Sequence, residues 1–379
     1  MMKTGVATFG LDTGKCPRWL FERMEKLAGI MSEIIIEEFG EDEFLKRLAD
    51  PIWFQSFGCA LAFDWNSSGL TVTTTAALKE ALRKRNLGIY ICGGKGRTSR
   101  KTPDEILTLS EKIGIDPEKY VRISKLVAKV DNSLIQDGFN IYHHSFILTQ
   151  KGSWAVIQQG MNTNLGLARR YHWYRSDANL CEPKRELMQT LVDKSGENLT
   201  EEPHSGIVSD KIFDKVLNLT SKQSNQNKKG IINLLNEENK LIKEMDLIFR
   251  KNNYKSLFLP SVEFKYHPVI EEKFDINRLK KSITKAQFLK PKTIDELLLF
   301  EGIGPRTIRA LSLVSELIYG AKPSYQDPAR YTFTHGGKDG TPYPVDRQTY
   351  DEVINFFNKA IKIIKQSKIS FYNVHFRGY

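Results

Sequence analysis

The spacing of apolar and polar positions divides the chain into a mixed N-terminal half and a helical C-terminal half. Residues 17–39 carry apolar side chains three and four positions apart, which predicts an amphipathic helix. Two apolar runs, over residues 138–149 and 153–159, are separated by a short turn and predict two neighbouring strands. Helices mixed with strands are typical of an α+β or α/β domain, which we assign to residues 1–180.

The next stretch, residues 181–225, is polar and has little periodicity. We expect it to be an extended connection between two domains. Apolar positions at helical spacing resume near Lys228, so residues 226–379 are predicted to form a mostly α-helical second domain.

One segment of the C-terminal half predicts two helices joined by a tight turn. Thr293 and Glu296 have the spacing of a capping box, which marks the start of a helix. Gly302 and Gly304 then allow a tight turn, and Pro305 suits the first position of the following helix. This order of helix, Gly-Ile-Gly and helix is the pattern of a helix-hairpin-helix. An ordinary corner between two helices is the alternative.

A turn of this kind offers a way to bind DNA. Bare glycine backbone lets a phosphate approach the N–H groups at a helix N-terminus, where the helix dipole favours an anion. The formal net charge of +11 also favours an anionic partner such as nucleic acid. The DNA-binding residues predicted in this segment are Gly302, Gly304, Arg306 and Thr307.

A second candidate phosphate contact follows the strand predicted near residues 87–92. The sequence Gly-Gly-Lys-Gly-Arg-Thr-Ser-Arg-Lys there lacks the spacing of a Walker loop but is rich in glycine and basic residues. That composition suits phosphate contacts, and a mobile solvated loop is an equal alternative. The basic residues concerned are Lys95, Arg97, Arg100 and Lys101.

The segment Pro342-Tyr-Pro-Val-Asp346 extends the C-terminal pattern. With it, residues 285–360 resemble the helix-hairpin-helix DNA glycosylase superfamily. The resemblance implies that Asp346 stabilises positive charge on the sugar as the base departs. Capping of a helix is the alternative role for this carboxylate.

Some members of that superfamily also cleave the strand, using a lysine two residues after the second glycine. This chain has Arg306 there, and an arginine cannot be deprotonated to act as the amine. The amine would therefore have to come from elsewhere. Lys129, which lies in an apolar stretch, and Lys95 are the candidates.

Several polar residues fall in segments that otherwise read as core strands. His143 and His144 are neighbours in one predicted strand, so alternation points them to opposite faces. Gln158 and His172 are further polar residues in predicted core segments. Buried polar groups cost free energy unless they are paired. Such a set often marks a site, and a satisfied structural network is the alternative.

His144 also allows a different enzyme. Together with Gly152 and Asn162 it is similar to the half-site of the phospholipase D superfamily, in which a histidine attacks phosphorus. Phe146 and Lys151 stand where that superfamily has lysine and aspartate. The resemblance implies a nuclease that needs no metal.

The chain as a whole resembles a family of archaeal and bacterial proteins catalogued as a domain of unknown function. The segments that carry this resemblance include Ser56-Phe-Gly-Cys, Asp64-Trp-Asn-Ser-Ser-Gly and Gln158-Gln-Gly-Met-Asn. The resemblance supplies no mechanism.

Composition sets further expectations. No stretch has the length and apolarity of a membrane-spanning helix, and we expect a cytoplasmic protein. The four cysteines are far apart, which suits a reducing compartment and argues against a zinc or iron–sulfur site. We therefore expect neither a metal nor a cofactor.

The leading hypothesis is a DNA repair enzyme acting on damaged or abasic DNA, as a DNA glycosylase, an AP lyase or both, in base excision repair. The alternatives are a phospholipase D-like DNA endonuclease using His144 and a DNA-binding protein without catalysis. The candidate catalytic residues are Asp346, Lys129, His144 and His172.

Overall fold

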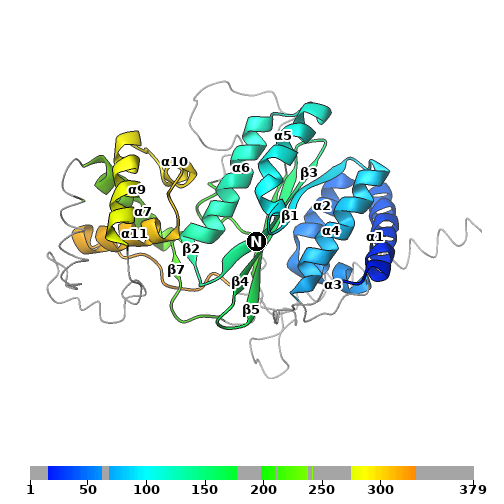
Figure 1. The fold of residues 1–379 in the computed structure, drawn as a ribbon, viewed down its shortest axis with the longest axis horizontal. Coiled ribbons are helices and arrows are strands. Elements are labelled where there is room, and N and C mark those ends of the chain that lie inside the picture. The colour runs from blue at the N-terminus through cyan, green and yellow to red at the C-terminus, as the bar shows by residue number, and fades with distance from the viewer. Residues whose placement is uncertain are drawn as a thin grey trace, which may run out of the picture. The chain divides into compact units, whose positions relative to one another are not determined.

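The computed structural model describes residues 16–61, 68–176, 198–209, 212–237, 241 and 275–329. All of them belong to one compact unit, residues 1–331. Within this unit, helices pack on both faces of a sheet (Figure 1). The predicted α+β class is confirmed because every strand pair is antiparallel.

The main sheet has five strands in the order β1-β3-β4-β5-β6. The strand pair predicted on either side of residues 150–152 is confirmed, since β3 and β4 are adjacent and antiparallel. The strands are β1 (Ile89–Lys95), β3 (Asn140–Thr149), β4 (Trp154–Asn162), β5 (Leu167–Arg175) and β6 (Gly206–Val208).

One face of the sheet is covered by the N-terminal helices. Ile147, Ala155 and Ile157 share a buried cluster with apolar residues of these helices. The predicted helix over residues 17–39 is confirmed as the first of them. The helices are α1 (Arg18–Phe39), α2 (Glu41–Ala49), α3 (Pro51–Ala60) and α4 (Gly69–Arg85).

The opposite face is covered by α5 (Thr102–Ile113) and α6 (Pro117–Lys129). Phe146 and Val156 alternate with the residues named above and belong to the second cluster. Successive side chains of β3 and β4 thus alternate between the two apolar clusters, as expected for strands that are buried on both faces. A π-helical segment, Val130–Leu134, follows α6 directly.

The described residues of the polar stretch 181–225 contain strands that the sequence analysis did not predict. Residues 206–208 form β6, the fifth strand of the sheet, through the buried Ile207 and Val208. Leu217–Asn218 form β7, which pairs with β2 (Ile135–Gln136). The expected extended connection is therefore wrong for these residues, because a run of two or three apolar residues is too short to give a periodic signal.

The later helices extend the second cluster. Apolar residues of α6, such as Val127, and of α11, such as Leu311, belong to one core. The described helices after residue 224 therefore share a core with one face of the sheet. They are α7 (Asn225–Asn236), α9 (Ile276–Leu289), α10 (Ile294–Leu299) and α11 (Pro305–Tyr319).

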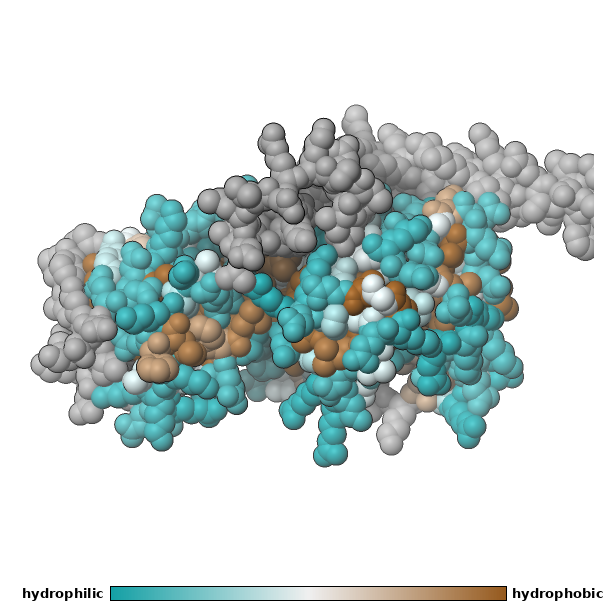
Figure 2. All heavy atoms as spheres, turned by 90° about the horizontal axis from the view of Figure 1, so that it is seen from above, coloured by the Kyte–Doolittle hydropathy of each residue, from teal (hydrophilic) through white to brown (hydrophobic). Residues whose placement is uncertain are grey.

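Hydrophilic residues cover most of the face that is coloured in Figure 2, with apolar patches between them. Among the described helices, none has the length and apolarity that crossing a membrane requires.

Candidate nucleic-acid interface

The turn between α10 and α11 is built by local sequence signals. Thr293 Oγ1 accepts the Glu296 N–H at 3.2 Å, and Glu296 Oε2 accepts the Lys292 N–H at 2.7 Å. These two bonds cap the start of α10, one residue away from the standard return bond of a capping box. Pro305 is the first residue of α11, as predicted.

The two glycines of the turn differ in backbone conformation. Gly302 has φ of +86°, which side chains rarely adopt. Gly304 has φ of −144°, which any residue adopts, and a Cβ there would meet nothing within 4 Å. The fold therefore does not require glycine at position 304, and the space beside its backbone is open.

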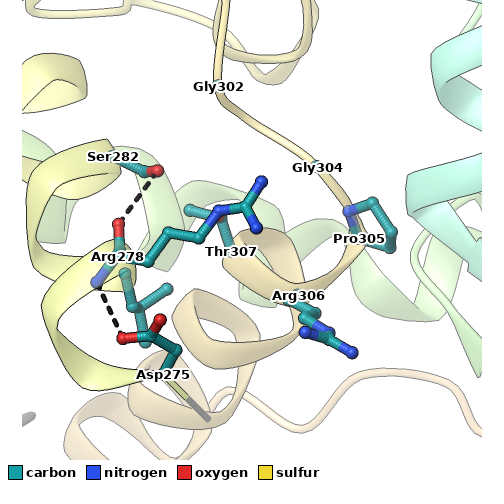
Figure 3. A pocket seen from close by; sticks show the side chains of 9 residues that line it. Asp275, Arg278, Ser282, Gly302, Gly304, Pro305, Arg306 and Thr307 are labelled. Carbon is teal, nitrogen blue, oxygen red and sulfur yellow. Dashed lines mark hydrogen bonds between the residues drawn. The ribbon is translucent and has the colours of Figure 1, made fainter.

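A pocket of about 300 Å³ lies between this turn and α9 (Figure 3). It brings together all four DNA-binding residues predicted in the segment. It also contains residues of α9 that the sequence analysis missed, because contact between α9 and the turn is not local in the chain. The lining residues are Asp275, Arg278, Leu279, Ser282, Gly302, Gly304, Pro305, Arg306 and Thr307.

The pocket is positively charged. Arg278 and Arg306 are exposed, and neither forms an ion pair with another described residue. Arg278 extends from α9 toward the turn, whereas Arg306 points away from α9 (Figure 3). The N-terminus of α11 adds free N–H groups and the positive end of its dipole. Asp275 carries the opposite charge, and its Oδ1 accepts the Arg278 N–H at 3.1 Å, which caps α9.

The hydroxyl group of Thr307 is a further open donor. Thr307 is only 6% exposed and lines the pocket. Its side chain has no hydrogen-bond partner among the described residues. Because Thr307 lines the pocket, this hydroxyl can donate a hydrogen bond to a polar ligand there.

Hydrogen bonds from the end of α6 and from β2 hold the turn before α11. Lys129 Nζ donates to the Ile303 carbonyl at 2.5 Å, and Gln136 Nε2 donates to the Pro305 carbonyl at 2.9 Å. Gln136 also accepts a hydrogen bond from Arg309 Nε. Two carbonyl groups of this segment, those of Ile303 and Pro305, thus accept hydrogen bonds from side chains outside it.

Lys129, a predicted catalytic residue, is therefore placed against the turn. It is half-buried, and burial lowers the pKa of its ammonium group. Its bonding partner is a neutral carbonyl, and it forms no ion pair with a described carboxylate. A lower pKa increases the fraction of neutral amine, which is the nucleophilic form.

The predicted basic loop begins at the end of β1. Its start is held by Glu105, whose Oε2 accepts the Gly93 N–H at 2.8 Å and the Lys79 ammonium at 2.6 Å. A Cβ on Gly93 would lie 2.3 Å from the His144 carbonyl oxygen, so that glycine is required. The four basic residues are all exposed, namely Lys95, Arg97, Arg100 and Lys101.

The polar residues predicted in the strands form a buried network. His144 Nδ1 donates to Gln158 Oε1 at 2.7 Å, and His144 Nε2 lies 2.8 Å from Ser124 Oγ. Gln158 Nε2 donates in turn to Asp131, which also accepts from Trp173 Nε1 at 2.8 Å and bonds His204. Both ring nitrogens of His144 are thus bonded inside the protein, and burial lowers its pKa.

His143 and His172 lie on the opposite face of the sheet from His144. His143 Nε2 bonds Thr75 Oγ1 at 3.1 Å, and burial lowers its pKa to about 3. His172 Nε2 accepts from Arg170 Nε at 2.7 Å, and burial together with this guanidinium lowers its pKa well below the usual value. The predicted alternation of His143 and His144 is confirmed, and all three histidines are buried and neutral.

A second buried set, which the sequence analysis missed, joins β5 to the segment after α11. The Arg169 guanidinium bonds Asp137 and Asp327, each at 2.8 Å. Tyr171 donates to Asp137 at 2.6 Å. These side chains are fully buried and bond one another, so they serve to hold the chain together.

The remaining predicted catalytic residue, Asp346, lies outside the described residues. Within the described ranges, no three histidine, cysteine, aspartate or glutamate side chains are grouped so that they could hold a metal ion.

The chain was compared with known families, curated proteins and solved structures. The model of one family, described as Protein of unknown function (DUF763), matches residues 5–345. No curated protein and no solved structure matches the chain.

Proposed function

The chain belongs to this family of proteins of unknown function (DUF763), and we propose that it is a DNA repair enzyme that binds damaged or abasic DNA. The observation that carries the proposal is the pocket between α9 and the turn before α11. There, the Arg278 guanidinium, the Thr307 side chain and a helix N-terminus line one open space, and Arg306 lies at its edge; neither arginine forms an ion pair with a described residue.

These groups suit a phosphodiester. Its charged oxygens accept hydrogen bonds from backbone N–H groups, from the Thr307 hydroxyl and from the Arg278 guanidinium. The open space beside Gly304 gives a phosphate room to approach the backbone. In this proposal α10, the turn and α11 act as a helix-hairpin-helix.

The basic loop after β1 is a second proposed contact with the DNA backbone. Its four exposed cations add to the formal net charge of +11. Contacts of this kind position a protein on DNA without selecting a sequence.

For the chemistry, we propose that Lys129 acts as the amine of an AP lyase. Its neutral amine attacks the C1′ aldehyde of an abasic deoxyribose, and water leaves as the imine forms. Water then takes a proton from C2′, a double bond forms between C2′ and C3′, and the 3′ phosphate leaves as its bond to C3′ breaks. Two observations support this role: burial lowers the pKa of Lys129, and its amine contacts the Ile303 carbonyl of the same turn.

Asp346 stays the predicted group for stabilising positive charge during base release. His144 receives no such role, because both of its ring nitrogens are bonded within the protein and it is 5% exposed. Its contacts support a structural role.

The test is incubation of the protein with labelled duplexes carrying uracil, hypoxanthine, an abasic site, a flap or a mismatch. Borohydride is added to trap an imine. We expect a trapped adduct on abasic DNA that is lost in Lys129→Arg, which keeps a donor for the Ile303 carbonyl but has no reactive amine. Lys95→Arg is the matched control and should retain the adduct.

Binding without any product would leave a DNA-binding protein without catalysis. Absence of binding to every duplex at low salt would contradict the whole proposal.

A further inference from the structure

The solvent-facing side of α9 combines positive charge with one exposed aromatic ring. Phe288 is 86% exposed, which is the largest exposure among the large apolar residues of the described chain. Arg278, Lys281 and Lys285 are exposed on the same helix, at the spacing that places them with Phe288 on one side. The buried residues of α9, including Leu279 and Ile283, lie on the other side.

This cationic side of α9 is continuous with the proposed phosphate site. Arg278 lines the pocket, and Lys285 pairs with Glu301 of the turn at 3.3 Å. Phe288 lies about 15 Å along the helix axis from Arg278, at about 1.5 Å per residue. That separation corresponds to about four base steps of B-DNA at about 3.4 Å each.

We propose that Phe288 is a stacking platform for an unpaired base of the DNA that is bound at the pocket. This inference rests on the proposed function and narrows its substrate class to DNA with unpaired bases, such as single strands, gaps or extruded nucleotides. The cations around the ring suit a polyanion, and the exposed ring suits a partner that offers flat aromatic surfaces. Unpaired nucleic acid supplies both.

Fully paired DNA is a poorer match for this surface. Its bases are stacked on each other, so the phenyl ring meets no free base unless a step is unstacked at a cost of a few kcal/mol. A stacking contact also differs from a phosphate contact in its response to salt, because it releases no counterions. These two differences define the test.

The experiment measures affinity of Phe288→Ala for three DNAs of one sequence: a single strand, a gapped duplex and a fully paired duplex. Leu289→Ala is the matched control, since Leu289 is the next residue and is also exposed. Each affinity is measured at several salt concentrations.

We expect Phe288→Ala to weaken binding to the single strand and the gapped duplex by about 5-fold to 100-fold. Binding to the paired duplex should change by less than about 2-fold, and the salt slope should stay the same on all three DNAs. Phe288→Trp should restore the affinity, and Lys281→Ala with Lys285→Ala should lower the salt slope instead.

An equal loss on all three DNAs, or no loss on any of them, would overturn this inference. If Gly304→Val still weakens binding in that case, the proposed function stands and only the stacking role fails. If the wild-type protein binds none of the DNAs, both fail together. A dimer that becomes a monomer in Phe288→Ala would assign the ring to contact between two copies, which also overturns the inference.

Discussion

The sheet interior and the pocket beside α11 are both rich in polar side chains, and they differ in what those side chains contact. In the sheet, His144, Gln158 and Asp131 bond one another and their neighbours. At the pocket, Arg278 and Thr307 have no polar side-chain partner among the described residues. His144, Gln158 and Asp131 are thus bonded within the protein, whereas the pocket leaves donors for another molecule.

The comparison shows why residue type alone is a poor guide to a site. Histidine and aspartate in core segments suggest catalysis, yet burial favours pairing, and Asp131 and both ring nitrogens of His144 are paired within the protein. The arginines beside the glycine turn form no ion pair with a described residue, and the open space there favours an anion. The two regions therefore respond differently to mutation: the first in stability, the second in binding.

The largest expected effect is on the sheet. Asp131→Ala removes the carboxylate that bonds Gln158, Trp173 and His204, and it leaves these groups buried without their partner. We expect a loss of about 3–5 kcal/mol in the free energy of unfolding, measured by urea titration. Asp131→Asn, which keeps an acceptor oxygen, should lose less.

The folded Asp131→Ala protein should bind DNA as the wild type does. If Asp131→Ala keeps full stability and loses DNA binding, the network is part of the functional site and the comparison fails.

The next effect is the dependence of stability on pH. His143, His144 and His172 have lowered pKa values in the folded state, with His143 at about 3. In the unfolded chain they take up protons near pH 6.5, so acid stabilises the unfolded state and folding stability falls as the pH drops below that value. Their contribution to the free energy of unfolding is fully present above about pH 6.5 and is lost as the pH falls from there toward their folded-state pKa values.

We expect a loss of about 1.4 kcal/mol for each histidine that stays neutral between pH 7.5 and 5.5. Urea titrations at the two pH values measure it, above the range in which ordinary carboxyl groups titrate. Stability that is level or higher at pH 5.5 would show that the histidines are not held neutral.

Substitution at the pocket should affect binding without affecting stability. Gly304→Val places a side chain in open space, so we expect an unchanged melting temperature. The added bulk blocks a phosphate, and DNA affinity should fall at least about tenfold, or about 1.4 kcal/mol. Gly302→Val is the contrasting variant and should also destabilise the fold by about 1–2 kcal/mol, because of its positive φ.

DNA affinity is measured by fluorescence anisotropy and the melting temperature is measured for each variant. Gly304→Val should lose affinity alone, whereas Gly302→Val should lose both. A stable Gly304→Val protein with wild-type affinity would remove the pocket from the DNA interface.

The smallest effect concerns the loop after β1. Replacing Lys95, Arg97, Arg100 and Lys101 by alanine should lower the slope of log affinity against log salt by about 0.9 for each lost phosphate contact. Stability should stay the same, since all four side chains are exposed. An unchanged slope would show that the loop makes no contact with DNA phosphates.

Local signals allowed much of this structure to be predicted from the sequence. The turn at Gly302, the helix start at Pro305 and the strand pair around residues 150–152 depend on neighbours in the chain, and they are confirmed. The short strand β6 and the ion pairs of Arg169 depend on residues far away in the chain, and the sequence analysis did not find them.

The same limit applies to the site. Arg306 and Thr307 were predicted because they follow the glycine turn, whereas Arg278 was missed because a separate helix brings it there. The contact of Lys129 with Ile303 could not be predicted from the sequence either, because the two residues are far apart in the chain. The role predicted for Asp346 depends on family resemblance alone.

The comparison between the two regions is tested most directly by amide hydrogen exchange with and without abasic DNA. Saturating DNA should slow exchange within residues 301–307, because the N–H groups of Gly304, Arg306 and Thr307 would bond a phosphate. Exchange in β3, β4 and β5 should stay the same, since their backbone groups are already paired in the sheet. Unchanged exchange at residues 301–307, with new protection confined to the sheet, would contradict the account.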